Sequence, residues 1–244
     1  MQGDCLLRKV YGGIDGCRSG WFSVFIDEQN CWSAKLYPNL FSLWSERSDS
    51  SLLLIDIPVG IVGCRGKQRS CDVLARKMLG GKRASAVFNV PCRKALYCSD
   101  YTDANRINKK YTGKGLSKQS WNIVPKIREA DNFLQTAKAA REVLRESHPE
   151  LCFKKLAKRD LVHNKKTEAG HIERMDILSA LYHDSHEIVE YAAESYRGKL
   201  FLDDILDSMV LALTAFLENK NIRSVPENRE TDEYGLKMEI VYPE

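Results

Sequence analysis

The sequence predicts an α/β fold in which short strands come first and longer helices follow. Two observations carry this prediction. Strand-like apolar segments alternate with turns through residues 10–57, and apolar residues recur at helical spacing over 167–183 and 203–218. Hydrophobic residues make up 43% of the 244 residues, which suits a large buried core. We expect residues 1–244 to form a single domain that carries an insertion at about 62–128.

The first elements indicate a meander of three strands over residues 10–17, 20–27 and 31–37. The turn Glu28-Gln29-Asn30 joins the second strand to the third as a hairpin. A short helix over 39–47 is expected next, because its apolar residues fall on one side.

The fourth strand is expected over residues 51–57, a continuous apolar run typical of a central strand that is buried on both faces. Pro58 and Gly60 end this run, and Asp56 is its only charged residue. Three strands, a helix and a buried fourth strand follow the element order of an RNase H-like fold, in which the first and fourth strands are neighbours. We therefore predict a mixed five-stranded sheet in the order 3-2-1-4-5, flanked by helices.

The rest of the chain is expected to be mainly helical, the insertion included. A helix over 70–80 ends at Gly80-Gly81, and residues 81–118 have the weak periodicity of an extended segment. The later elements are expected to be a helical stretch over 117–147 interrupted near Pro125, a fifth strand over 150–153, helices over 167–183 and 203–218, and a final strand over 237–243.

Neither a signal peptide nor a membrane span is expected, because no window approaches about 18 uncharged apolar residues. The eight cysteines include no Cys-x-x-Cys pair, which argues against a zinc ribbon or a redox motif. We expect a cytoplasmic protein with free thiols and no membrane contact.

The net charge of +4 conceals a strong asymmetry along the chain. Residues 62–128 hold 16 Lys or Arg against three Asp, a net charge of +13, and the remainder of the chain carries −9. Such a segment is typical of a protein that binds a polyanion, and nucleic acid is the expected partner. An ordinary solvated face is the alternative explanation.

Four acidic residues stand where the pattern otherwise predicts core. Asp15 ends an apolar stretch, Asp56 follows Leu-Leu-Leu-Ile, and Asp204 and Asp207 open the apolar helix over 203–218. Burying a carboxylate is costly unless it is paired, protonated or bound to a cation. In the expected sheet, Asp15 and Asp56 lie side by side, and the i, i+3 spacing puts Asp204 and Asp207 on one helical face. A shared divalent metal site would account for all four.

The expected cofactor is Mg²⁺ or Mn²⁺, because hard cations prefer oxygen ligands. Two such ions about 4 Å apart can activate water and stabilise the leaving oxygen in phosphodiester cleavage. Simpler roles remain open: Asp203 and Asp204 could favour a helix N-terminus, Asp15 could cap a turn, and Asp56 could satisfy backbone donors.

His148-Pro149-Glu150 is a further candidate for the same site. Glu150 is expected to reach the edge near Asp56 as a catalytic residue or further ligand. His148 could move protons or contact phosphate, because its unperturbed pKa lies near neutrality, although a structural hydrogen-bonding role is the alternative.

The chain also resembles a known family, the predicted RNase H-like nucleases catalogued as domain of unknown function 429. The segments that carry the resemblance are Gly13-Ile14-Asp15-Gly16-Cys17-Arg18, Ile55-Asp56-Ile57-Pro58-Val59-Gly60, residues 69–80, 113–119 and 126–131, His148-Pro149-Glu150, residues 165–170 and residues 203–207. The resemblance implies an RNase H-like fold and, by analogy with nucleases of that fold, metal-dependent phosphodiester cleavage. Resolvase-like chemistry would favour a homodimer.

In a nuclease, basic side chains would neutralise phosphates. The expected nucleic-acid-binding residues are Arg18, Arg65, Arg69, Arg76, Arg83, Arg93, Lys94 and Lys118. Two other functions remain open at this point. One is a nucleic-acid-binding protein without catalysis, and the other is a phosphotransferase related to the actin and sugar kinase group.

Overall fold

A mixed five-stranded sheet forms the centre of the protein, in the order β3-β2-β1-β4-β5. The computed structural model describes residues 8–63 and 68–244. The strands are β1 (Val10–Cys17), β2 (Gly20–Asp27), β3 (Trp32–Tyr37), β4 (Leu52–Ile55) and β5 (Leu144–Glu146). β1, β2 and β3 pair antiparallel, whereas β4 runs parallel to both β1 and β5. The α/β class and the strand order are those predicted from the sequence, and the order is consistent with an RNase H-like arrangement.

Local sequence explains the meander. The Asp27 carboxylate accepts hydrogen bonds from the backbone N–H groups of Gln29 and Cys31, at 2.8 and 3.0 Å. Asn30 adopts a positive φ of 61°, which an asparagine tolerates better than most residues. These contacts close the hairpin between β2 and β3 at the predicted turn.

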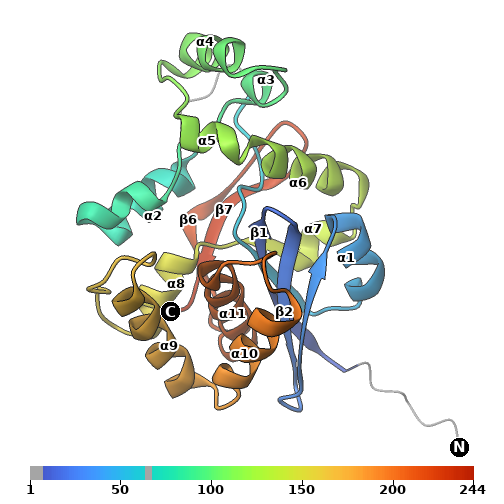
Figure 1. Ribbon diagram of the computed structural model, residues 1–244. Helices are drawn as coiled ribbons and strands as arrows, with labels where there is room; N and C mark the ends of the chain where they lie inside the picture. The colour runs from blue at the N-terminus through green and yellow to red at the C-terminus, as the bar shows by residue number, and fades with distance from the viewer. Residues whose placement is uncertain (1–7, 64–67) are drawn as a thin grey trace, which may run out of the picture.

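Two layers of helices cover the sheet. On one face, α8 (Pro149–Leu156), α9 (Glu168–Leu181), α10 (Ser185–Ser195) and α11 (Leu202–Leu217) enclose the larger core cluster. On the other face lie α1 (Leu40–Arg47), α6 (Val124–Thr136) and α7 (Ala140–Val143). Figure 1 shows α11 close against β1 and β2, the strands on which it packs most extensively.

The insertion is built from short helices. They are α2 (Ser70–Leu79), the 3₁₀ helix η1 (Gly81–Ala86), α3 (Arg93–Leu96), α4 (Tyr101–Thr112) and α5 (Lys118–Asn122). In Figure 1, α3 and α4 project from the top of the molecule, away from the sheet. A small second sheet of β6 (Arg223–Thr231) and β7 (Lys237–Tyr242) lies near α2, and the pairing of Ser147 with Val241 links it to the end of β5.

Four expectations about individual elements were wrong or incomplete. Residues 150–153 are helical rather than a strand, because Pro149 starts α8 at a position that needs no N–H donor, and β5 instead precedes it. The expected helical stretch over 117–147 is divided into α5, α6, α7 and β5. Residues 81–118 are largely helical rather than extended. The final strand was predicted correctly, but its partner β6 was not foreseen.

Within the described residues, no helix is both long enough and apolar enough to cross a bilayer. Free thiols are present at Cys17, Cys31, Cys71, Cys98 and Cys152, as expected for these five positions.

Candidate active site

Asp15 and Asp56 lie side by side at the carboxyl ends of two central parallel strands. The backbone N–H of Asp56 donates to the carbonyl oxygen of Ile14 at 2.9 Å, which continues the pairing of Ile14 with Ile55. Because side chains alternate along a strand, Asp15 points to the face opposite that of Ile14, which packs in the cluster with α1 and α6. Asp15 therefore faces the helical layer that contains α11.

Helix α11 brings two more carboxylates to this edge. Its backbone approaches β1 closely at Gly13, where a Cβ atom would lie only 2.1 Å from the Ser208 oxygen. Asp207, in the first turns of the helix, is 2% exposed. Asp204 has a second role, because its Oδ2 accepts a hydrogen bond of 2.8 Å from the backbone N–H of Phe201 and so caps the helix.

These carboxylates are close enough to affect one another's ionisation. Burial raises the pKa of Asp15 well above its usual range, and the charges of Asp56, Asp207 and Asp204 raise it further. Burial also raises the pKa of Asp207 to about 7. The ammonium of Lys165 opposes this rise, and the charge of Asp56 adds to it. Burial likewise raises the pKa of Asp56 and of Asp204. The cluster therefore favours any positive charge placed within it.

Lys165 supplies one such charge. Its Nζ lies 2.6 Å from Oδ2 of Asp207. Burial alone would lower the pKa of Lys165, but the carboxylates of Asp207 and Asp56 outweigh this effect and raise it. In the sequence, residues 165–170 stand out only as part of a segment that resembles the family. Lys165 was not predicted as a site residue, because nothing in the local sequence pattern shows that its loop returns to the edge of the sheet.

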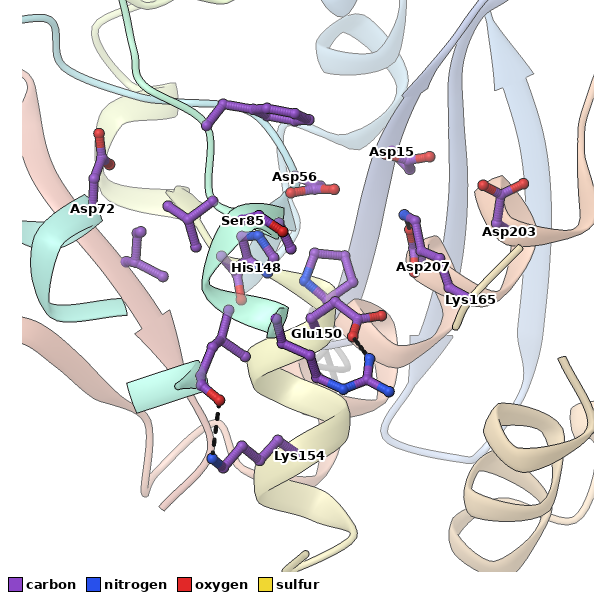
Figure 2. Close-up of a pocket in the computed structure, with 18 of the residues that line it drawn as sticks. Asp15, Asp56, Asp72, Ser85, His148, Glu150, Lys154, Lys165, Asp203 and Asp207 are labelled. Carbon is purple, nitrogen blue, oxygen red and sulfur yellow. Dashed lines mark hydrogen bonds and ion pairs between the residues drawn. The ribbon is translucent and has the colours of Figure 1, made fainter. Parts of the chain in front are cut away.

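The carboxylates open into a pocket of about 980 Å³. Figure 2 shows Asp15, Asp56 and Asp207 directed into the same part of this pocket, with Lys165 beside Asp207 and with Asp72 on the far side. Val87, Phe88, Val90 and Ile123, from the insertion and the residues after α5, contribute apolar lining. Among the described residues, nine Asp or Glu and six Lys or Arg line the pocket, so this part of its lining is acidic on balance.

Glu150 reaches the pocket, but both of its carboxylate oxygens are paired. Arg174 Nη2 binds Oε1 and Arg83 Nη1 binds Oε2. These two partners outweigh the effect of burial and lower the pKa of Glu150. Both carboxylate oxygens of Glu150 thus hold an arginine, which favours a structural role, and its expected role as a ligand or catalytic residue stays a prediction.

His148 occupies the N-cap position of α8, without a capping hydrogen bond from its side chain, and lines the pocket near Asp56. Its interaction with Asp56 opposes the rise in the pKa of that carboxyl, in which burial is the largest cause. In the part of the chain that the structure describes, the buried Nδ1 of His148 has no hydrogen-bond partner.

Several expected phosphate-binding arginines serve inside the protein instead. Arg69 is buried and pairs with Glu146 and Asp72. Arg93 is buried against three acidic side chains, Arg76 donates to the carbonyl oxygens of residues 87 and 88, and Arg83 donates to those of residues 161 and 163. The expected role requires solvent-facing guanidinium groups, so burial argues against it for Arg69 and Arg93.

The other expected contacts are distributed differently. Arg18, Lys94 and Lys118 are exposed, and Lys118 lies 3.8 Å from the centre of the Tyr101 ring. None of the three lines the pocket. Arg65 lies outside the described residues.

The donor set fits a hard cation, although the carboxylates do not surround one as they stand. In residues 8–63 and 68–244, no group of three or more His, Cys, Asp or Glu side chains is arranged to hold a metal ion. Oδ1 of Asp207, however, is buried without a partner among these residues. An unpartnered carboxylate oxygen beside three other acids is the environment that Mg²⁺ or Mn²⁺ would satisfy.

A family model described as "Protein of unknown function (DUF429)" matches residues 13–231. No curated protein and no solved structure matches the chain. The matched segment runs from β1 to the end of β6 and includes all four clustered aspartates. The chain therefore belongs to the DUF429 family.

Proposed function

We propose that the protein is a divalent-metal-dependent nuclease that hydrolyses phosphodiester bonds. One observation carries the proposal: Asp15, Asp56, Asp204 and Asp207 gather at the end of two central strands, and a buried oxygen of Asp207 has no partner among the described residues. Such a cluster is unfavourable without a counter-charge, and its oxygens are the ligands that Mg²⁺ and Mn²⁺ prefer.

The side chains divide the work of hydrolysis among them. Asp15, Asp56 and Asp207, with Asp204, would hold the cation, which when bound supplies Lewis-acid activation of water and neutralises charge on the phosphate. His148, which lines the pocket and whose Nδ1 has no hydrogen-bond partner among the described residues, would accept or return a proton. Glu150 pairs with Arg83 and Arg174 and so holds the wall of the pocket to which Glu150 and Arg83 belong.

The pocket also offers features that suit a nucleotide. Phe88 provides an aromatic face on the apolar side, on which a base could stack. Exposed basic side chains extend over the insertion: Lys77, Lys94, Arg106, Lys109, Lys110, Lys114 and Lys118. Phosphates along a strand would be neutralised there, whereas the acidic pocket would accept a phosphate only together with a cation. The free thiols support a reducing compartment, which we propose to be the cytoplasm.

A nucleic-acid-binding protein without catalysis is the second candidate. The observation that favours it is the ion pair between Lys165 and Asp207, which already neutralises part of the cluster. The basic surface would then account for binding, and the carboxylates would serve only the structure.

Cleavage assays separate the two candidates. Labelled single-stranded, duplex, hybrid and branched DNA and RNA are incubated with wild-type protein and Mg²⁺ or Mn²⁺, and with Asp56→Asn. Metal-dependent cleavage that is lost in Asp56→Asn supports the nuclease. Salt-dependent binding by both proteins without cleavage would overturn it in favour of the second candidate. Circular dichroism of both proteins ensures that lost cleavage does not reflect lost folding.

A further inference from the structure

Lys165 lies within the carboxylate cluster on a loop that the protein holds firmly. Its Nζ binds Oδ2 of Asp207 at 2.6 Å, and the pocket that it lines also contains Asp15, Asp56 and Asp204. The next residue, Lys166, also lines the pocket but is exposed and makes no ion pair among the described residues. The two adjacent lysines therefore differ in environment.

Glu173 of α9 holds the backbone before Lys165. Its carboxylate accepts hydrogen bonds from the backbone N–H of Val162, at 2.9 and 3.0 Å, and from that of His163, at 2.9 Å. Arg83 donates from the other side to the carbonyl oxygens of Leu161 and His163, at 2.8 Å each for Nη2. The Glu173 carboxylate thus holds N–H groups within residues 161–163, and the Arg83 guanidinium holds carbonyl oxygens within the same residues.

The segment around Lys165 also fits closely against the start of α9. A Cβ atom on Gly170 would lie 1.9 Å from the backbone carbonyl oxygen of Asn164, so only glycine lets the helix approach this backbone so closely. The backbone N–H of Thr167 donates to that same oxygen at 3.0 Å, and the Thr167 hydroxyl caps α9. These contacts leave the backbone at Lys165 little freedom to withdraw from the site.

We propose that the site binds one divalent cation and that the Lys165 ammonium takes the place of a second. The ammonium pairs with one oxygen of Asp207 and so supplies, inside the cluster, the positive charge that a second ion would otherwise supply. A second cation would have to displace a buried ion pair and then lie close to the displaced charge. The other oxygen of Asp207 is left for the single ion.

This arrangement gives Lys165 a direct role if the proposed nuclease function is correct. Because Lys165 lines the pocket that holds the carboxylates, its ammonium would donate hydrogen bonds to the oxygens of a bound phosphate and stabilise developing negative charge. No bond of Lys165 itself is made or broken. The number of ions bound does not depend on the nuclease activity, so the two proposals can fail separately.

The test counts Mn²⁺ ions by equilibrium dialysis and electron paramagnetic resonance on wild type, Lys165→Met and Lys165→Arg. Lys166→Met is the matched control, since it removes an adjacent ammonium that pairs with no acid among the described residues. We expect one Mn²⁺ per chain for wild type, Lys165→Arg and Lys166→Met, and a second ion for Lys165→Met, with the spin coupling of a nearby pair.

Two Mn²⁺ ions in the wild type would overturn the inference, and this count stands even if Lys165→Met fails to fold. A folded Lys165→Met protein that binds one ion would overturn it as well. Wild type that binds one ion but cleaves no nucleic acid would overturn the nuclease proposal and support the stoichiometry. A wild type that cleaves nucleic acid but holds two ions would support the nuclease proposal and overturn the inference that Lys165 replaces the second ion.

Discussion

Gly13 lies directly against the backbone of Ser208, where α11 meets β1. A Cβ atom at position 13 would lie 2.1 Å from the backbone carbonyl oxygen of Ser208 and 2.2 Å from the backbone nitrogen of Ala212. Both atoms belong to helix backbone, so neither can move without shifting the helix. The close contact sets the position of Asp207 relative to Asp15, and glycine is the residue that permits it.

Gly13→Ala is therefore expected to push α11 away from the sheet. We predict a loss of about 3 kcal/mol or more in the free energy of unfolding, measured by urea denaturation. Gly63→Ala is the control, because its Cβ would make only an ordinary contact of 3.6 Å with Glu233. Equal stability of the two variants would contradict the close packing of α11 on β1.

Glu150 is expected to matter for stability, since it pairs with the buried Arg174. The Arg174 side chain is 1% exposed, so Glu150→Ala leaves a buried charge without its partner. We predict a loss of about 3–5 kcal/mol in the free energy of unfolding. Glu244→Ala breaks a pair whose side chains are both more than half exposed, and is expected to cost less than about 1 kcal/mol.

Thermal and urea unfolding of these two variants provide the comparison. If Glu150→Ala were as stable as Glu244→Ala and lost only metal binding, Glu150 would be a ligand and its structural assignment would be wrong.

Glu173 is expected to make folding sensitive to acid. Burial would raise its pKa, but the hydrogen bonds from Arg159 and from the backbone N–H groups of His163 and Val162 outweigh this and lower the pKa of Glu173 to about 2. A group with a lowered pKa in the folded state stabilises the fold at pH values above its unfolded pKa of 4.5. That contribution declines as the pH falls from about 5 to about 2.

Glu173→Gln should remove this contribution, which we expect to be about 2 kcal/mol at neutral pH. The measurement is the free energy of unfolding from pH 2 to pH 7 for both proteins. The difference between wild type and Glu173→Gln should be largest at neutral pH and should shrink towards pH 2. A difference that does not change with pH would contradict the assigned pKa.

The strand order could be predicted from the sequence, because most of the strands are visible as local patterns of apolar residues and turns. The apolar run of β4 and the turn after Asp27 are evident without any knowledge of their neighbours. β5 was not found at its actual position, because it has only three residues and lies between two helices. Its pairing with β4, rather than its own pattern, makes it a strand.

The site was accessible in part. Asp15, Asp56 and Asp207 stood out because a lone acid in an apolar segment is visible in sequence. The position of Lys165 was not visible, because it depends on contacts that Glu173 and Arg83 make with a distant loop. The buried arginines of the insertion were misleading for a similar reason, since a positive charge in sequence does not show whether an acid lies beside it.

Asp207 and Asp203 provide the most direct test of the central claim, because they lie one turn apart on α11 and differ in environment. Asp207 is buried in the cluster and binds Lys165, whereas Asp203 is half-buried in the first turn of the helix. The measurement is the single-turnover cleavage rate of a labelled nucleic acid with Mn²⁺ for wild type, Asp207→Asn and Asp203→Asn.

We predict metal-dependent cleavage by the wild type, a decrease on the order of 100-fold or more for Asp207→Asn, and a change of less than about 3-fold for Asp203→Asn. Cleavage by Asp207→Asn at the wild-type rate, or a wild type that cleaves no DNA or RNA of any structure with Mn²⁺ or Mg²⁺, would contradict the assignment of this carboxylate cluster as a nuclease site.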